Sequence, residues 1–90
     1  MREVILDGGK INSRDQLHAF LKEALELPEY YGDNLDALWD CLTEEAGMPL
    51  TVRWLHFQKS EEKLGEYSQL LLQLFRDAEC ELEDFRLLLE

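Results

Sequence analysis

Basic side chains are missing from one continuous third of this 90-residue sequence. No Lys or Arg occurs from residue 23 to residue 52, and the same thirty residues hold eight of the chain's twenty acidic side chains. The other sixty residues hold twelve acids and nine bases, so they contribute only −3 to the net charge of −11. This sign of charge argues against nucleic acid or an anionic membrane as a partner, because both would repel the protein. The acidic third therefore produces a localised negative electrostatic field.

Other absences narrow the class of protein. No run of about eighteen apolar residues is present, which predicts no membrane span, and the first ten residues lack the apolar core of a secretion signal. We therefore expect a cytoplasmic protein. The two cysteines, Cys41 and Cys80, match no metal-ligand spacing, and we expect two buried thiols instead of a disulfide.

Short β-prone runs alternate with helical patterns along the chain. Strands are expected at 2–6, 50–55 and 85–89. Helices are expected at 13–27, from 33 or 34 to 43, at 60–64 and at 66–80. Strands joined by helical crossovers predict an α/β fold with a small three-stranded parallel sheet and three to four helices. At this length we expect a single domain over residues 1–90.

Local signals set the expected helix boundaries. Ser13 followed by Gln16 predicts a capping box, and Pro28 prevents that helix from continuing. Asp33 or Asn34 can cap the second helix. In the last helix, one apolar face is expected to be buried, formed by Leu70, Leu71, Leu74, Phe75 and Ala78.

The stretch PEYYGDNLDALWDCLTEE, residues 28–45, holds six carboxylates and three large aromatic side chains. At about 100° per residue, Leu35, Leu38 and Leu42 share one face of the second helix. The opposite face carries Asp36, Asp40, Thr43 and Glu44, and Trp39 lies at the border. Most charge runs are simply solvated helix faces. Asp33 and Asp36 fit that interpretation, because they lie near the positive end of the helix dipole.

Asp40, Glu44 and Glu45 do not fit it, because carboxylates near the end of a helix face the negative end of its dipole. Asp36 and Asp40 also repel each other at a spacing of four residues, and the helix has no basic side chain to offset this. A local inconsistency of this kind is typical of a functional site. The complementary partner would carry a cationic cleft, and Tyr30, Tyr31 and Trp39 are the residue types that anchor such interfaces.

The segment PEYYGDNLDALWDCLT closely resembles the signature segment of the barstar family, the intracellular protein inhibitors of barnase-type ribonucleases. The similarity extends to residues 13–27, 49–54 and 75–78, so it covers nearly the whole chain. It implies a barstar-like fold and an inhibitor with no catalytic residues, metal or cofactor. The implied partner is a secreted, cationic ribonuclease bound in a 1:1 complex, with the inhibitor monomeric before it binds.

The resemblance also implies which side chains bind the ribonuclease. Asp40 matches the acid that takes the place of the substrate phosphate, and Tyr30 matches a tyrosine that stacks on the catalytic histidine of the enzyme. Further implied contacts are Asn34, Asp36, Trp39, Thr43 and Asp77, with Glu81 as a more peripheral acid. Glu44 and Glu45 replace a Gly-Trp pair of the family's best-known member, which removes an aromatic contact and adds two charges.

Some alternatives stay open at this stage. Met48 replaces the tyrosine before the family's cis proline, so a cis bond at Pro49 is a hypothesis. A magnesium-dependent phosphohydrolase could use Asp33, Asp36 and Asp40 as ligands, although their spacing matches no EF-hand and no second acidic motif at catalytic spacing is recognisable. A generic acidic adaptor for another basic protein is a further alternative. His18, expected on a helix exterior or boundary, and His56, just after a strand, are interpreted as ordinary structural histidines.

Overall fold

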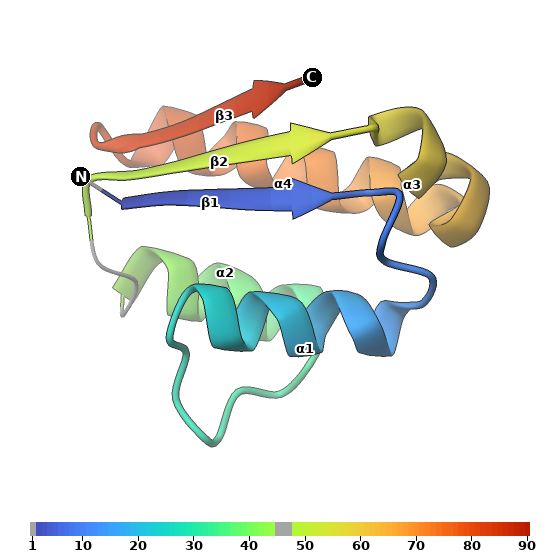
Figure 1. The fold of residues 1–90 in the computed structure, drawn as a ribbon. Helices are drawn as coiled ribbons and strands as arrows, with labels where there is room; N and C mark the ends of the chain where they lie inside the picture. The colour runs from blue at the N-terminus through green and yellow to red at the C-terminus, as the bar shows by residue number, and fades with distance from the viewer. Residues whose placement is uncertain (1, 45–47) are drawn as a thin grey trace.

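The structure is a computed structural model that describes residues 2–44 and 48–90. Within these residues, three strands and four helices form an α/β fold. In chain order they are β1 (Arg2–Asp7), α1 (Arg14–Ala24), α2 (Leu35–Glu44), β2 (Leu50–Leu55), α3 (Phe57–Leu64), α4 (Glu66–Glu81) and β3 (Phe85–Leu89). Figure 1 shows this arrangement. The predicted three-stranded parallel sheet with about four helices is confirmed.

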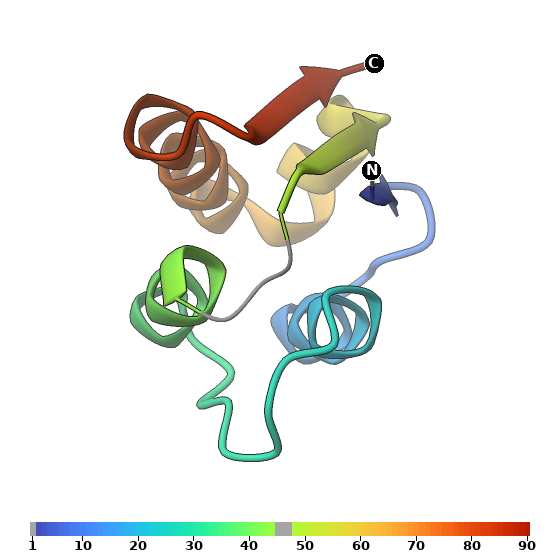
Figure 2. The same ribbon diagram turned by 90° about the vertical axis from the view of Figure 1, so that its left-hand side faces the viewer.

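The sheet has the order β1-β2-β3 and two unlike faces. The helices α1, α2 and α4 lie on one side of it, while α3 lies beyond the carboxyl ends of the strands (Figures 1 and 2). Val4, Val52 and Leu87 are paired in register and point into the core. The next row points outward, with Ile5 exposed beside Arg53. The alternation of buried and more exposed residues in β1 and β2 follows from this one-sided cover.

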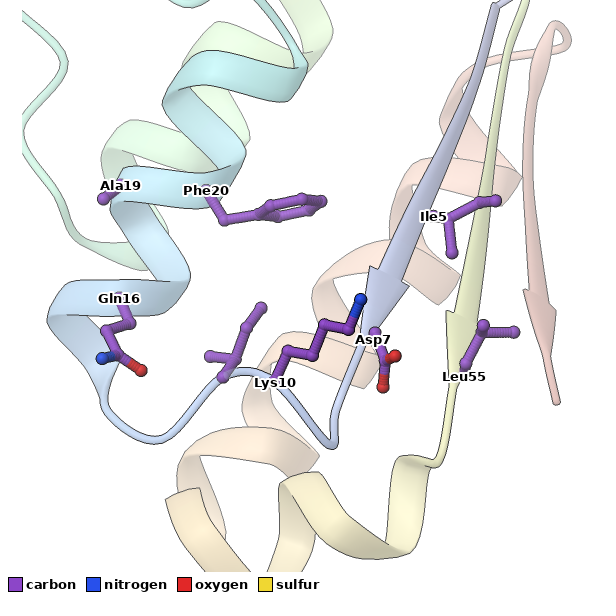
Figure 3. A pocket seen from close by; sticks show the side chains of 8 residues that line it. Ile5, Asp7, Lys10, Gln16, Ala19, Phe20 and Leu55 are labelled. Atoms are coloured by element: carbon purple, nitrogen blue, oxygen red, sulfur yellow. The ribbon is translucent and has the colours of Figure 1, made fainter.

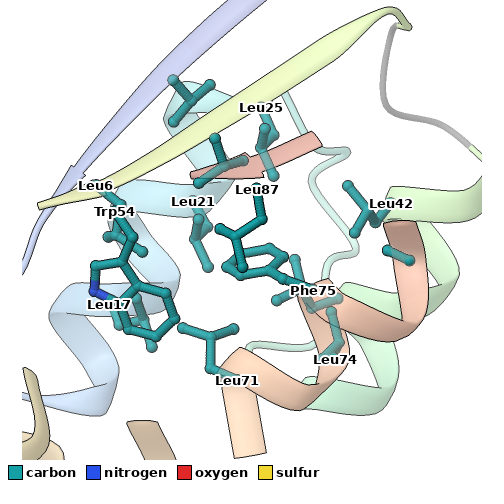
Figure 4. Packing of buried hydrophobic residues seen from close by; sticks show 14 of the residues in the cluster. Leu6, Leu17, Leu21, Leu25, Leu42, Trp54, Leu71, Leu74, Phe75 and Leu87 are labelled. Carbon is teal, nitrogen blue, oxygen red and sulfur yellow. The ribbon is translucent and has the colours of Figure 1, made fainter. Parts of the chain in front are cut away.

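The core fills the space between the inner sheet face and the three helices that cover it (Figure 4). Trp54 of β2 is fully buried, and its ring packs edge-on against Phe75 of α4 at a centroid distance of 6.0 Å. Its indole Nε1 donates a hydrogen bond of 3.0 Å to the buried hydroxyl of Ser60. Each large apolar side chain buried here stabilises the fold by roughly 1.5–3 kcal/mol. This core holds α2 and α4 in fixed positions beside each other.

The first helix is capped as predicted but ends early. Ser13 Oγ accepts a hydrogen bond from the Gln16 N–H at 3.1 Å. The Gln16 side chain accepts from the N–H of Asn12 at 2.8 Å, so the reciprocal bond falls one residue before the position that a standard capping box predicts. The expected end at residue 27 is wrong, because α1 ends at Ala24 and Glu26 is left-handed, with φ of 54°.

Four smaller expectations have mixed outcomes. The Met48–Pro49 peptide bond is cis, as hypothesised. The helix expected from residue 60 begins at Phe57, directly after His56. Cys41 and Cys80 are both thiols, but only Cys41 is buried, and the expectation of burial is wrong for Cys80, which is exposed on α4. Among the described helices, none has the length and apolar character needed to cross a membrane.

Candidate functional site

Helix α2 presents three exposed carboxylates along one face. Leu38 and Leu42 are fully buried on the opposite face, as the helical spacing predicts, while Leu35, assigned to the same face, is only partly buried. Asp36, Asp40 and Glu44 are exposed, and we call these three residues the acidic ridge. At a rise of about 1.5 Å per residue, the ridge extends along roughly 12 Å of the helix. Glu45, predicted to add a further charge, lies outside the described residues.

The acidic ridge is not neutralised by the rest of the described chain. Within residues 2–44 and 48–90, the ion pairs join other parts of the protein, and none includes a ridge carboxylate. The last turn of α2 also contains no basic side chain. The repulsion between Asp36 and Asp40, and between Asp40 and Glu44, therefore persists in the folded protein at a cost of a few tenths of a kcal/mol per pair.

A short loop leads into α2 and carries two of the predicted contact residues, Tyr30 and Asn34. Asn34 is the cap of the helix, since its Oδ1 accepts from the N–H of Ala37 at 2.8 Å and its Nδ2 donates to the carbonyl of Gly32 at 3.2 Å. Asp33, the other candidate cap, is left-handed, with φ of 54°. Tyr30 is 74% exposed. The loop thus carries an exposed aromatic ring and the residue that caps the acidic helix.

Helix α4 packs beside α2 and extends the acidic surface. Two shallow hollows of about 260 and 320 Å³ lie between these helices, and the half-buried Trp39 lines both. The first is lined by Leu35, Asp36, Trp39, Leu70, Gln73, Leu74 and Asp77. The second is lined by Trp39, Asp77, Cys80 and Glu81. The structure therefore brings Asp77 and Glu81 together with Trp39, although they are distant in sequence.

Two side chains in this region differ from the simplest expectation. Leu70, assigned to the buried face of the last helix, is 55% exposed and lines the hollow beside Trp39. At 100° per residue it lies about 90° from the centre of the truly buried face, so the sequence contained the signal for its border position. Thr43 is half-buried, and its hydroxyl donates to the carbonyl of Trp39 at 2.9 Å.

His18 is the clearest correction to the sequence-based interpretation. The expected position at a helix exterior or boundary is wrong, because His18 is 2% exposed, with Nδ1 at 2.6 Å from the Tyr31 hydroxyl and Nε2 at 2.5 Å from the Tyr67 hydroxyl. Burial lowers the pKa of His18, while the charges of Asp33 and Asp15 act in the opposite direction. Burial also raises the pKa of Tyr31 and Tyr67. The spacing of α1 contained no signal for these partners.

The magnesium-site alternative is not supported by the geometry. Among the residues that the structure describes, no three His, Cys, Asp or Glu side chains are placed together so as to hold a metal ion. Asp33, Asp36 and Asp40 therefore do not form the gathered ligand set that this alternative requires.

A hollow of about 650 Å³ lies elsewhere, between β1 and α1 (Figure 3). It is lined by Ile5, Asp7, Lys10, Ile11, Gln16, Ala19, Phe20 and Leu55. None of the predicted contact residues borders it, so it is separate from the surface of α2 and α4.

Comparison with known proteins gives two findings. A family model described as "Barstar (barnase inhibitor)" matches residues 1–90. A protein of Bacillus subtilis (strain 168), named "Putative ribonuclease inhibitor YrdF", is 43% identical over 91 residues, and the match covers all of both chains. The similarity therefore includes α2, α4 and the loop before α2.

Proposed function

This chain belongs to the barstar family, and from this premise we propose that it inhibits a barnase-type ribonuclease by covering the active site of the enzyme. Proteins of this family are ribonuclease inhibitors, not enzymes, and the chain is an inhibitor in that general sense. Our proposal adds the type of target, a 1:1 complex and the surface that binds. That surface consists of the loop before α2, the acidic ridge and the adjoining face of α4.

The exposed, unneutralised carboxylates of α2 are the observation that carries this proposal. A ribonuclease cleft must hold a phosphodiester, so it contains fixed cationic groups whose charge is only partly compensated when the cleft is empty. Asp40, at the middle of the ridge, would meet these groups in place of the substrate phosphate. Each charge-assisted hydrogen bond from an arginine to this carboxylate would contribute roughly 1.5–3 kcal/mol.

The side chains around Asp40 would define the edge of the contact. Tyr30 is exposed and can stack on a ring of the enzyme, while Trp39 lies between the two acidic helices. Asp77 and Glu81 would extend the contact onto α4, and Asn34, Thr43 and Glu44 would complete it along α2. Central aromatic anchors with desolvated charges are the usual source of affinity in tight complexes.

The acidic field would also act before contact. A charged surface facing a partner of opposite charge raises the association rate by about 10–10³ at low ionic strength. Eight acids and no bases in residues 23–52 give this third of the chain, which includes α2, most of the net negative charge. Inhibition should therefore weaken with added salt mainly through slower association.

The proposal can be tested by titrating the purified protein into barnase-type ribonucleases and following RNA cleavage together with the heat of binding. We expect stoichiometric inhibition at a 1:1 ratio. Asp40→Ala should weaken binding by roughly 3–5 kcal/mol, because cationic groups of the enzyme would stay buried without a partner. This corresponds to about two to four orders of magnitude in Kd.

A matched control is Glu23→Ala, which also removes one exposed carboxylate but lies on α1. This variant should bind nearly as well as the wild type, apart from a small salt-dependent change in association rate. Equal inhibition by Asp40→Ala and Glu23→Ala would remove the assigned role of Asp40. Binding to a ribonuclease without loss of its activity would favour the acidic-adaptor alternative.

A further inference from the structure

His18 joins three parts of the chain that are far apart in sequence. It lies on α1, and its two ring nitrogens contact Tyr31, 13 residues away in the loop before α2, and Tyr67, 49 residues away on α4. All three side chains are buried. The loop, α1 and α4 are thus connected through one imidazole ring.

The loop before α2 depends on Tyr31 for its attachment to the core. All of residues 28–34 are described, and Tyr31 is the one buried residue among them. Its N–H also bonds to the carbonyl of Pro28 at 3.0 Å, which closes a turn around Tyr30. This loop projects away from the sheet, beyond the ends of α1 and α2 (Figure 1). The burial of this loop against the core therefore rests on Tyr31.

The two ring nitrogens of His18 have different hydrogen-bonding roles. A neutral ring has one nitrogen that donates and one that accepts, so one tyrosine hydroxyl accepts from His18 and the other donates to it. Both tyrosine rings also lie beside the imidazole, with centroid distances of 5.7 and 5.8 Å. Chains of buried hydrogen bonds strengthen one another, and each half-satisfied group in them is costly.

Tyr67 is held on its far side by a further contact. The guanidinium carbon of Arg14 lies 4.3 Å from the centroid of the Tyr67 ring, a distance suited to a cation–π interaction. A hollow of about 350 Å³ opens beside this pair, and it is also lined by Asp33, Asn34 and Asp36. The network therefore lies directly beneath the surface where the loop meets the first turn of α2.

We propose that His18 is a positioning residue, which holds Tyr31 and Tyr67 together so that the loop carrying Tyr30 is already in its binding conformation before the inhibitor meets the enzyme. This inference rests on the proposed function for the part that concerns affinity. The part that concerns the loop refers to the isolated protein alone. His18 and Tyr67 touch no partner in this mechanism, and they act through Tyr31.

The expected size of the effect follows from population arithmetic. Apparent affinity falls in proportion to the fraction of the unbound protein that is competent to bind. If loss of one hydroxyl reduces the ordered loop to about a tenth of the population, the affinity falls about tenfold. The contacts within the complex would stay the same.

The test uses Tyr31→Phe and Tyr67→Phe, which delete one hydroxyl each and keep the rings, including the ring under Arg14. The matched control is Ser60→Ala, which deletes a buried hydroxyl that accepts from Trp54, in the part of the core near α3. Amide hydrogen exchange of residues 29–35 is measured in the isolated proteins. Both tyrosine variants should show a larger increase of exchange in this loop than in the rest of the chain, and Ser60→Ala should not.

A double-mutant cycle tests the link to binding. Tyr67→Phe should weaken binding to an inhibited barnase-type ribonuclease about tenfold in the wild-type background. In the Tyr30→Ala background it should weaken binding clearly less, because the side chain that the loop positions is gone. A merely structural loss of stability would give the same change in both backgrounds.

The outcomes separate the two proposals. Unchanged loop exchange in both tyrosine variants, or equal binding penalties in the two backgrounds, would overturn the positioning role of His18. Faster loop exchange in a protein that inhibits no ribonuclease would support the positioning of the loop and contradict the proposed function. The exchange experiment needs no ribonuclease, so it can be decided independently.

Discussion

Two charged surfaces of this protein differ in whether their charges form ion pairs. On the outer face of the sheet, Arg53 is placed between two acids, with its Nε 2.6 Å from an Oε of Glu90 and its Nη1 3.7 Å from an Oε of Glu3. The hydrogen bond and charge of Glu90 raise the pKa of Arg53, and the same contact lowers the pKa of Glu90. On the acidic ridge, the described residues provide no such counter-charge.

The difference shows that ion pairing is available to this fold, and that the described residues do not supply it on the acidic ridge. Strand register brings Arg53 into reach of acids on either side of it. Nothing in helical geometry would prevent a lysine four residues from Asp40, where it would stabilise α2. A surface that keeps its repulsion is suited to a partner that supplies the cations. On the outer sheet face, Arg53 already has its counter-charges in Glu3 and Glu90.

A cation introduced into α2 would give the acidic ridge the ion pair that it lacks. Glu44→Lys places a cation four residues after Asp40 and near the negative end of the helix dipole. The free energy of unfolding should rise by about 0.5–1 kcal/mol. Binding to the ribonuclease should weaken by roughly a hundredfold, because the lysine competes for Asp40 and repels the cationic cleft. Urea denaturation and inhibition titrations measure the two effects.

Glu44→Lys is informative because it should raise stability and weaken binding at the same time. Glu62→Lys serves as a control, since it reverses an exposed charge on α3 by the same amount. It should change inhibition far less than Glu44→Lys does. A variant at residue 44 that gains stability and inhibits as tightly as the wild type would show that the ridge has no need of its unneutralised charge.

Much of this surface could be predicted because it follows from local rules. The buried face of α2 and the exposed positions of Asp36, Asp40 and Glu44 follow from a period of 3.6 residues. The parallel sheet follows from the alternation of strand-like and helix-like segments. The identity of the capping residue, Asn34 in preference to Asp33, required the backbone, because both side chains can accept the same bond.

Two of the failed expectations, those for His18 and Cys80, concern contacts between distant residues, while the end of α1, the start of α3 and the exposure of Leu70 are local errors. His18 occupies an ordinary helical position, and its burial depends on tyrosines 13 and 49 residues away. Cys80 lies where α4 faces solvent beside α2, a relation fixed by tertiary packing. The network around Arg53 likewise depends on strand register, which helical or strand periodicity does not specify. Local patterns predicted the exposed acids of α2, and the resemblance to the barstar family pointed to Asp77 and Glu81, while tertiary contacts determine what supports these side chains.

The stability of the protein should depend on pH through His18, a buried group that the fold keeps neutral. A solvated histidine has a pKa of about 6.5, and burial lowers the pKa of His18 in the folded protein. Between the folded pKa and about 6.5, the unfolded chain binds more protons, so stability falls as the pH falls through this window. Above about pH 6.5 the contribution of the neutral ring is complete.

The charged and titratable groups that act on His18 are Asp15 on α1, Tyr31 and Asp33 on the loop, and Tyr67 on α4. Arg14 of α1 lies over the ring of Tyr67. The two acids favour the protonated ring, yet burial outweighs them. The free energy of unfolding of wild type minus that of His18→Gln should decrease from about pH 7 to pH 5. A flat difference would mean that His18 titrates alike in both states.

Helix α4 contains two acids in different surroundings, the partly buried Glu79 and the exposed Asp77. Glu79 accepts from the Leu87 N–H on β3 and from Arg76, each at 2.8 Å. Partial burial raises the pKa of Glu79, but these contacts outweigh it and hold the pKa below its usual value. Glu79→Gln should lower the free energy of unfolding by about 0.5–1.5 kcal/mol and leave inhibition nearly unchanged.

A substitution of Asp77, on the same helix, should weaken binding and leave stability nearly unchanged. Asp77 is exposed, and its Oδ1 accepts from the Gln73 side chain at 2.9 Å. Asp77→Asn should keep its stability, because the amide oxygen can still accept that bond, and should weaken binding to the ribonuclease. Denaturation curves and inhibition titrations of both variants test this. If Asp77→Asn destabilised the protein and left binding intact, α4 would be only a structural support.

The smallest effect is expected where the charges are already paired. Arg53→Gln leaves Glu3 and Glu90 close to each other without their cation, so the melting temperature should fall slightly at low salt and recover at about 1 M salt, where exposed charges are screened. Affinity for the ribonuclease should not decrease, since the variant becomes more negative and the outer sheet face lies outside the proposed contact. A loss of affinity comparable to that of Asp40→Ala would place the enzyme on the sheet, because only direct contact could make a distant, neutralised charge matter so much.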